Sequence, residues 1–161
     1  MKRILMVCMG NICRSPMAAI VAAQLAKSAL LGKIEVDSAG THAAALGERP
    51  DPRAKASLLA RKYVVGSGRP RRVVDRDFER FDLILAMDSK NALDLRRICP
   101  EEHLEKIRLF LEFAPECGQF EVPDPYYGSA QGFDAVLDLC ETGARGLVRH
   151  LQALPAVSQT L

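Results

Sequence analysis

Short apolar runs along this chain alternate with longer segments in which apolar residues recur every three or four positions. The runs have the length and composition of buried strands. They cover residues 3–8, 33–38, 83–87 and 107–110. The periodic segments predict helices over 15–31, 51–63 and 88–98, and a last long helix around 133–151.

Alternating strands and helices favour one architecture, an α/β fold. We expect a single domain over residues 1–161, built on a four-stranded parallel sheet with helices on both faces. Prolines at 16, 50 and 52 mark helix starts, and Asp88 is predicted to cap the helix that follows it. Ligands of such folds bind beyond the C-terminal ends of the strands.

One strand end carries a reactive group. The first strand leads directly into Cys8, and a five-residue loop then reaches Arg14, Ser15 and the helix start at Pro16. Backbone N–H groups of such a loop converge on one point, and the helix N-terminus adds positive potential there. The segment therefore predicts an oxyanion site, a phosphate cradle with a thiol at its floor.

The residue types fit this chemistry. A thiolate is the attacking species, and a helix N-terminus and an arginine both favour it, so Cys8 is the predicted nucleophile. Arg14 can hold two phosphate oxygens through its planar fork, and Ser15 can donate to the sulfur. Gly10 is expected to supply a positive φ, and Asn11 to bond the loop backbone. The predicted phosphate-binding residues are Met9, Gly10, Asn11, Ile12, Cys13, Arg14 and Ser15.

Two other kinds of site fit the segment poorly. A nucleotide-binding loop of the Walker type would continue into Gly-Lys-Ser/Thr, which is absent. A zinc site would need a second pair of ligands besides Cys8 and Cys13, but the histidines at 42, 103 and 150 are scattered. We expect no metal and no cofactor.

The amino-acid composition indicates the cellular location and the class of partner. Five irregularly spaced cysteines among 161 residues favour a reducing compartment, so a cytoplasmic location is predicted. No apolar stretch is long enough for membrane insertion. The net charge of +2 and 6% aromatic residues disfavour a nucleic-acid partner. The one dense basic patch is predicted to be a solvated loop: Arg69, Arg71, Arg72 and Arg76.

A second motif lies far downstream, at Asp124-Pro125-Tyr126-Tyr127. A carboxyl group between two prolines is held in a stiff loop, and ester cleavage needs an acid for the departing oxygen, so Asp124 is the predicted general acid. Together with the segments at 8–16, 37–41, 50–54 and 81–88, this motif resembles the low-molecular-weight protein tyrosine phosphatases, of the bacterial type.

This resemblance implies a phosphatase that acts on phosphotyrosine and aryl phosphates through a cysteinyl-phosphate intermediate. It implies that Tyr126, Tyr127 and His42 line the substrate cleft, and that Ser38 supports the loop through Asn11. It also implies a phosphotyrosine protein as partner, such as a tyrosine autokinase of polysaccharide export, and a monomer or weak dimer.

The chain departs from the family pattern in two places. Many members carry a tryptophan after the second strand, where this chain has the segment 41–47 and no tryptophan at all. Many also have a supporting histidine where Gly68 stands. These departures leave one wall of the cleft and one support of Asn11 undefined.

Several alternatives stay open at this point. Cys13 is either a protective disulfide partner of Cys8 or a small apolar filler. The same fold could serve an arsenate reductase, although no close cysteine pair follows the third strand. A phosphoarginine phosphatase usually has threonine where Ile12 stands. A phosphotyrosine-binding module without turnover is the non-enzymatic alternative.

Overall fold

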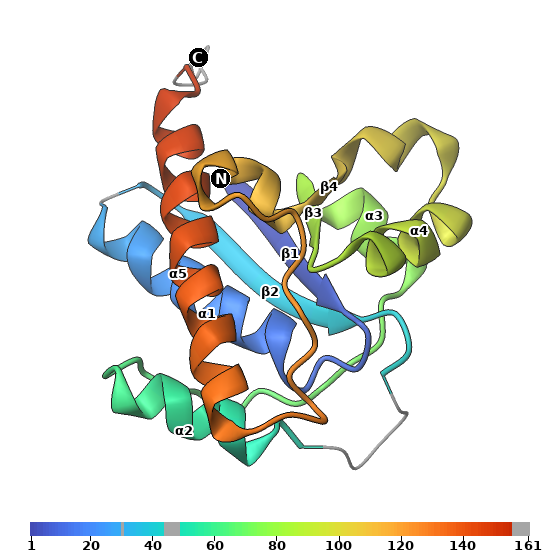
Figure 1. Cartoon of the computed structure of the whole chain (residues 1–161). Helices are drawn as coiled ribbons and strands as arrows, with labels where there is room; N and C mark the ends of the chain where they lie inside the picture. The colour runs from blue at the N-terminus through green and yellow to red at the C-terminus, as the bar shows by residue number, and fades with distance from the viewer. Residues whose placement is uncertain (30, 44–48, 156–161) are drawn as a thin grey trace.

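A computed structural model describes residues 1–29, 31–43 and 49–155 of the chain. At its centre is a four-stranded sheet in which every strand pair is parallel, in the order β2-β1-β3-β4 (Figure 1). The strands are β1 (Lys2–Cys8), β2 (Ile34–Gly40), β3 (Leu83–Ala86) and β4 (Ile107–Leu109). The predicted fold class is confirmed, with strand bounds within two residues of the expected ones.

Helices cover both faces of this sheet. One apolar cluster packs α1 (Arg14–Ser28), α2 (Pro52–Ala60) and α5 (Ala130–Ala153) on one face. A second cluster packs α3 (Asp75–Arg80) and α4 (Ser89–Ile98) on the other. The central strand supplies both clusters, because Met6 points to the first while Leu5 and Val7 point to the second.

The sequence pattern missed the short helices. It did not predict α3 or the three 3-10 helices η1 (Glu101–Lys106), η2 (Phe110–Phe113) and η3 (Pro115–Cys117). A six-residue helix such as α3, in which Phe78 is the one buried apolar residue, is too short to display a period. The helix predicted to reach residue 31 ends at Ser28.

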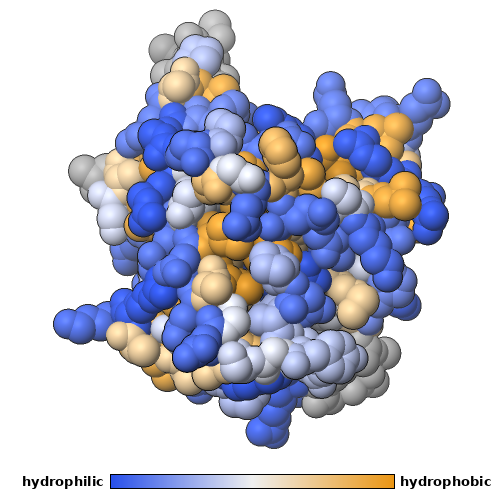
Figure 2. All heavy atoms as spheres, in the orientation of Figure 1, coloured by the Kyte–Doolittle hydropathy of each residue, from blue (hydrophilic) through white to orange (hydrophobic). Residues whose placement is uncertain are grey.

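The face of the molecule seen in Figure 2 is mainly polar. In the view of Figure 2, hydrophilic residues surround the molecule and hydrophobic ones gather near the centre of the face. Within the described ranges, no helix has the length and apolar character needed to span a membrane.

Candidate active site

The candidate site lies where β1 ends. The loop from Met9 to Cys13 curls from Cys8 to the start of α1, beside the ends of the other strands (Figure 1). Its left-handed residue is Asn11, with φ 56°, so the prediction that Gly10 supplies the positive φ is wrong. Asparagine tolerates this conformation because its short side chain can hydrogen-bond locally.

The sulfur of Cys8 is buried and has two polar neighbours. The Ser15 Oγ lies 3.0 Å from it, and the backbone N–H of Asn11 donates to it at 3.3 Å. Asn11 Nδ2 also donates to Ser15 Oγ at 2.9 Å, so the hydroxyl keeps its own hydrogen for another acceptor. That acceptor is the Cys8 sulfur or, at 3.3 Å, the Ala39 carbonyl. The surroundings of Cys8 therefore suit a thiolate.

Asn11 is also held from outside the loop. Its Nδ2 donates to Ser38 Oγ at 2.9 Å, the contact through which Ser38 was expected to support the loop. Its Oδ1 accepts the backbone N–H of Arg71, also at 2.9 Å. This N–H supplies a support for Asn11 that the absence of a histidine at Gly68 had left undefined.

The sequence analysis placed Arg71 in a solvated basic patch, and for this residue the prediction is wrong. Its guanidinium is paired with Asp37 and Asp77, each at 2.9 Å. These pairs fix the segment that presents the Arg71 backbone to Asn11. No sequence pattern indicated this role, because Asp37 and Asp77 lie 40 residues apart in the chain.

Gly40 is a second residue that the sequence reading missed. A Cβ at this position would lie 2.6 Å from the Met9 carbonyl oxygen and 3.0 Å from the Asn11 nitrogen. Only glycine therefore lets the end of β2 pack directly against the backbone of the phosphate loop. A glycine two residues after the end of the predicted strand was the available signal.

Arg14 is almost fully buried and firmly oriented. Its Nη1 donates to Asp88 Oδ2 at 2.6 Å and to the Val122 carbonyl at 3.0 Å. Asp88 does cap α4, as predicted, by accepting the N–H of Asn91 at 2.7 Å. Its second oxygen, however, orients the arginine, so Asp88 serves both purposes.

Asp124 reaches the same arginine from the far side. Its Oδ2 lies 3.8 Å from Arg14 Nη2, and its Oδ1 accepts the N–H of Tyr126 at 3.0 Å. The carboxyl group is about two-fifths exposed. The carboxyl group of Asp124, on an exposed loop, therefore lies close to the buried loop that begins at Cys8.

Most of the predicted site residues meet in one cleft of about 220 Å³. It is lined by Cys8, Met9, Gly10, Ile12, Cys13, Arg14, His42, Asp124, Tyr126 and Tyr127. The two tyrosine rings meet edge to face at 5.0 Å, and Tyr127 is 94% exposed. Of the predicted site residues, Asn11, Ser15 and Ser38 lie outside the cleft lining and act from beneath the loop. The expected second wall falls partly on residues 44–47, outside the described residues.

Cys13 lines the cleft with Cys8 but has a different environment. Burial, reinforced by the charge of Asp51, raises the pKa of the Cys13 thiol to about 12. The neutral thiol donates to Asp51 Oδ2 at 3.7 Å. Cys13 is therefore a protonated donor, and no disulfide joins it to Cys8.

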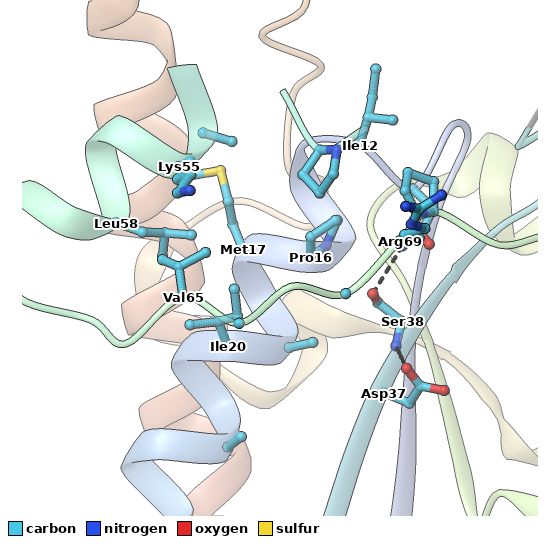
Figure 3. Close-up of a pocket in the computed structure, with 18 of the residues that line it drawn as sticks. Ile12, Pro16, Met17, Ile20, Asp37, Ser38, Lys55, Leu58, Val65 and Arg69 are labelled. Carbon is cyan, nitrogen blue, oxygen red and sulfur yellow. Dashed lines mark hydrogen bonds between the residues drawn. The ribbon is translucent and has the colours of Figure 1, made fainter. Parts of the chain in front are cut away.

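Behind the phosphate loop lies a second cavity, of about 290 Å³ (Figure 3). Its walls are largely apolar side chains from the loop, α1 and α2, among them Ile12, Met17, Ile20 and Leu58. Ile12 lines both this cavity and the cleft. In the part of the chain that the structure describes, no group of three or more His, Cys, Asp or Glu side chains could hold a metal ion.

A family model described as low molecular weight phosphotyrosine protein phosphatase matches residues 3–156. This chain belongs to that family. A family member of Streptomyces coelicolor, a low molecular weight protein-tyrosine-phosphatase, is 40% identical over 91% of both chains. The phosphatase thus has the family and the hydrolase class that the motifs indicated.

Solved structures agree with this assignment. A low molecular weight phosphotyrosine phosphatase of Vibrio cholerae is 38% identical, with a TM-score of 0.92, over 97% of this chain and all of that one. The arginine phosphatase YwlE is also similar, at 25% identity and a TM-score of 0.83, over 94% of this chain and 96% of that one.

Proposed function

We propose that this phosphatase hydrolyses phosphotyrosine through a phosphate ester of Cys8. The Cys8 thiolate attacks phosphorus while Arg14 and the loop N–H groups bind the oxygens of the phosphoryl group. The S–P bond forms as the P–O bond to the aryl group breaks. Asp124 gives its proton to the departing phenolate oxygen.

The second step reverses the role of the acid. Asp124, now a carboxylate, takes a proton from a water molecule that attacks phosphorus. The S–P bond breaks, inorganic phosphate leaves, and the hydroxyl of Ser15 stabilises the returning thiolate of Cys8. The observation that carries this proposal is the single cleft in which Cys8, Arg14 and Asp124 all present their side chains.

Tyr126 and Tyr127 support an aryl substrate, because their rings stand at the mouth of this cleft. A phosphotyrosine protein is the substrate of the family. Three further points stay predictions. The resemblance predicts a tyrosine autokinase of polysaccharide export as partner and a monomer or weak dimer, and the composition predicts a cytoplasmic location. A pull-down with Cys8→Ser as a trap would identify the partner.

The alternatives receive less support. Identity to the arginine phosphatase is 25%, against 38–40% to the tyrosine phosphatases reported above. A reductase would need cysteines that relay a disulfide from the loop. Cys140 is fully buried, and Cys99 packs against the cluster on the opposite face of the sheet from Cys8.

The test is to follow labelled phosphate from an aryl phosphate in the presence of a chelator. Acid quenching during turnover should leave label bound to the wild-type protein, whereas Cys8→Ser should release no product. Turnover by Cys8→Ser at the wild-type rate, or wild-type turnover without any trapped label, would contradict the proposal.

A further inference from the structure

The loop that carries Asp124 is bound at its other end by an arginine from α2. Arg53 Nη2 donates to the carbonyl of Tyr126 at 2.8 Å, and its Nη1 donates to the carbonyl of Gly128 at 3.2 Å. Its guanidinium also lies 5.6 Å from the centre of the Tyr126 ring and 4.6 Å from that of Phe133. One side chain therefore fixes the backbone just after the acid.

Arg53 is itself held by a buried carboxylate. Asp51 accepts Arg53 Nε at 3.1 Å and Nη2 at 2.9 Å, through different oxygens. This pairing holds the pKa of the Asp51 carboxyl below its usual range, so it stays charged. A planar fork bound in this way has a fixed direction, unlike a freely moving surface arginine.

Asp51 in turn is attached to the phosphate loop. Its backbone N–H donates to the carbonyl of Ile12 at 2.8 Å, and the thiol of Cys13 donates to its side chain. The carboxylate also caps α2 by accepting the N–H of Arg53 at 2.9 Å. The same residue thus touches the loop of the nucleophile and directs the arginine that holds the loop of the acid.

These contacts close a ring. From the phosphate loop it runs through Asp51, Arg53 and the backbone of Tyr126 to Asp124, whose carboxyl group returns to Arg14. Within the ring, the backbone of Tyr126 makes both contacts of the second loop. Its N–H binds Asp124 and the carbonyl of the same residue binds Arg53.

We propose that Arg53, directed by Asp51, is a positioning residue that sets the distance between the general acid and the phosphate loop. The proposal rests on the proposed role of Asp124 as the acid. Arg53 lies outside the lining of the cleft and touches no reacting atom. Its effect should therefore appear only where the departing oxygen needs a proton.

The experiment compares two substrates whose leaving groups differ in that need. Phenolate requires a proton, whereas 2,4-dinitrophenolate leaves readily as an anion. For Arg53→Met, kcat/KM should fall about 10–100-fold with phenyl phosphate, because small misplacements of a catalytic group have effects of this size. With 2,4-dinitrophenyl phosphate it should stay within about threefold. Arg53→Lys, which keeps one donor group, should fall between Arg53→Met and wild type.

Arg61 provides a matched control. It also joins α2 to α5, through Asp138 at 2.7 Å and Glu141 at 3.3 Å. It makes no hydrogen bond or ion pair with the acid loop, which is the segment 122–128 that carries Asp124. Arg61→Met should lower the melting temperature and leave the ratio of the two kcat/KM values at its wild-type level. If Arg61→Met changes that ratio as Arg53→Met does, the effect is general loosening and the proposal is wrong.

A double variant separates this inference from the proposed function. Asp124→Asn should depress phenyl phosphate selectively, and adding Arg53→Met to it should cause little further loss, because both changes remove the same proton transfer. If Asp124→Asn depresses both substrates equally, the proposed acid is wrong. If Asp124→Asn is selective but Arg53→Met depresses both substrates equally, only the positioning role is overturned.

Discussion

The two loops of the active site are built in opposite ways. The phosphate loop, from Cys8 to Ser15, is largely buried. It is bonded within itself, as Cys8 is to Ser15, and it is also supported from neighbouring segments, as Asn11 is by Ser38 and the Arg71 backbone. The acid loop is exposed and is held from far away: Arg14 binds the Val122 carbonyl 108 residues on, and Arg53 binds that of Tyr126 73 residues on.

This difference assigns separate parts of the proposed reaction to the two loops. A buried loop with supports on several sides keeps its shape and suits the proposed nucleophile and anion site. A loop held by two arginines depends on the packing of α1 and α2, so its acid can shift without disturbing the anion site. Disrupting one loop should therefore change a different measurement from disrupting the other.

The largest expected effect is on the acid loop. Asp124→Asn should reduce kcat/KM for phenyl phosphate by about 10²–10⁴-fold, the contribution of a positioned general acid. Inhibition by inorganic phosphate should stay as strong or become stronger, because a negative charge 3.8 Å from Arg14 is removed. Initial-rate kinetics with and without phosphate measure both quantities.

The matched change in the phosphate loop is Arg14→Lys. Lysine cannot form the bidentate contact, so inhibition by phosphate should weaken about tenfold or more. Equal weakening by Asp124→Asn would contradict the separation of the two loops.

An intermediate effect is expected at Asn11, which supports the phosphate loop. Asn11→Gly removes three side-chain hydrogen bonds but tolerates the positive φ, whereas Asn11→Ala removes the bonds and strains the backbone. Both should lower kcat/KM for both leaving groups alike. Asn11→Ala should be less stable than Asn11→Gly by about 1 kcal/mol. Urea unfolding of the two variants checks this, and equal stability would show that the left-handed backbone is unstrained.

The smallest effect concerns pH and stability at Asp51. Because its folded pKa is lowered, Asp51 stabilises the fold above the unfolded pKa of about 4, and this contribution disappears as pH falls through the folded pKa. Asp51→Asn keeps a good helix cap and removes the charge. The stability difference between wild type and Asp51→Asn should therefore shrink as the pH is lowered from about 6 to about 3. A difference that is constant across this range would contradict the charged pairing with Arg53.

The sequence allowed the strands, the five-residue loop and the cluster of Cys8, Arg14 and Asp124 to be predicted. The strands are apolar on both faces because helices bury both faces of the sheet. Such continuous apolar runs can be recognised from the sequence without knowledge of the neighbouring strands. It did not reveal α3, which is too short for a period, or the contacts of Arg71, which depend on two distant carboxylates. Gly10 was assigned the left-handed conformation of Asn11, because from sequence alone glycine is the usual candidate.

The amino-acid sequence by itself determined the proposed reacting groups and the proposed anion site, because Cys8, Arg14 and the start of α1 are neighbours along the chain. The tertiary structure decided how the acid is held: Asp88 orients Arg14, while Asp51 and Arg53 bind the far end of the acid loop. The physical reason is distance along the chain. Local hydrogen bonds follow from spacing, whereas an arginine that binds a distant carbonyl is aimed only once helices have packed on the sheet.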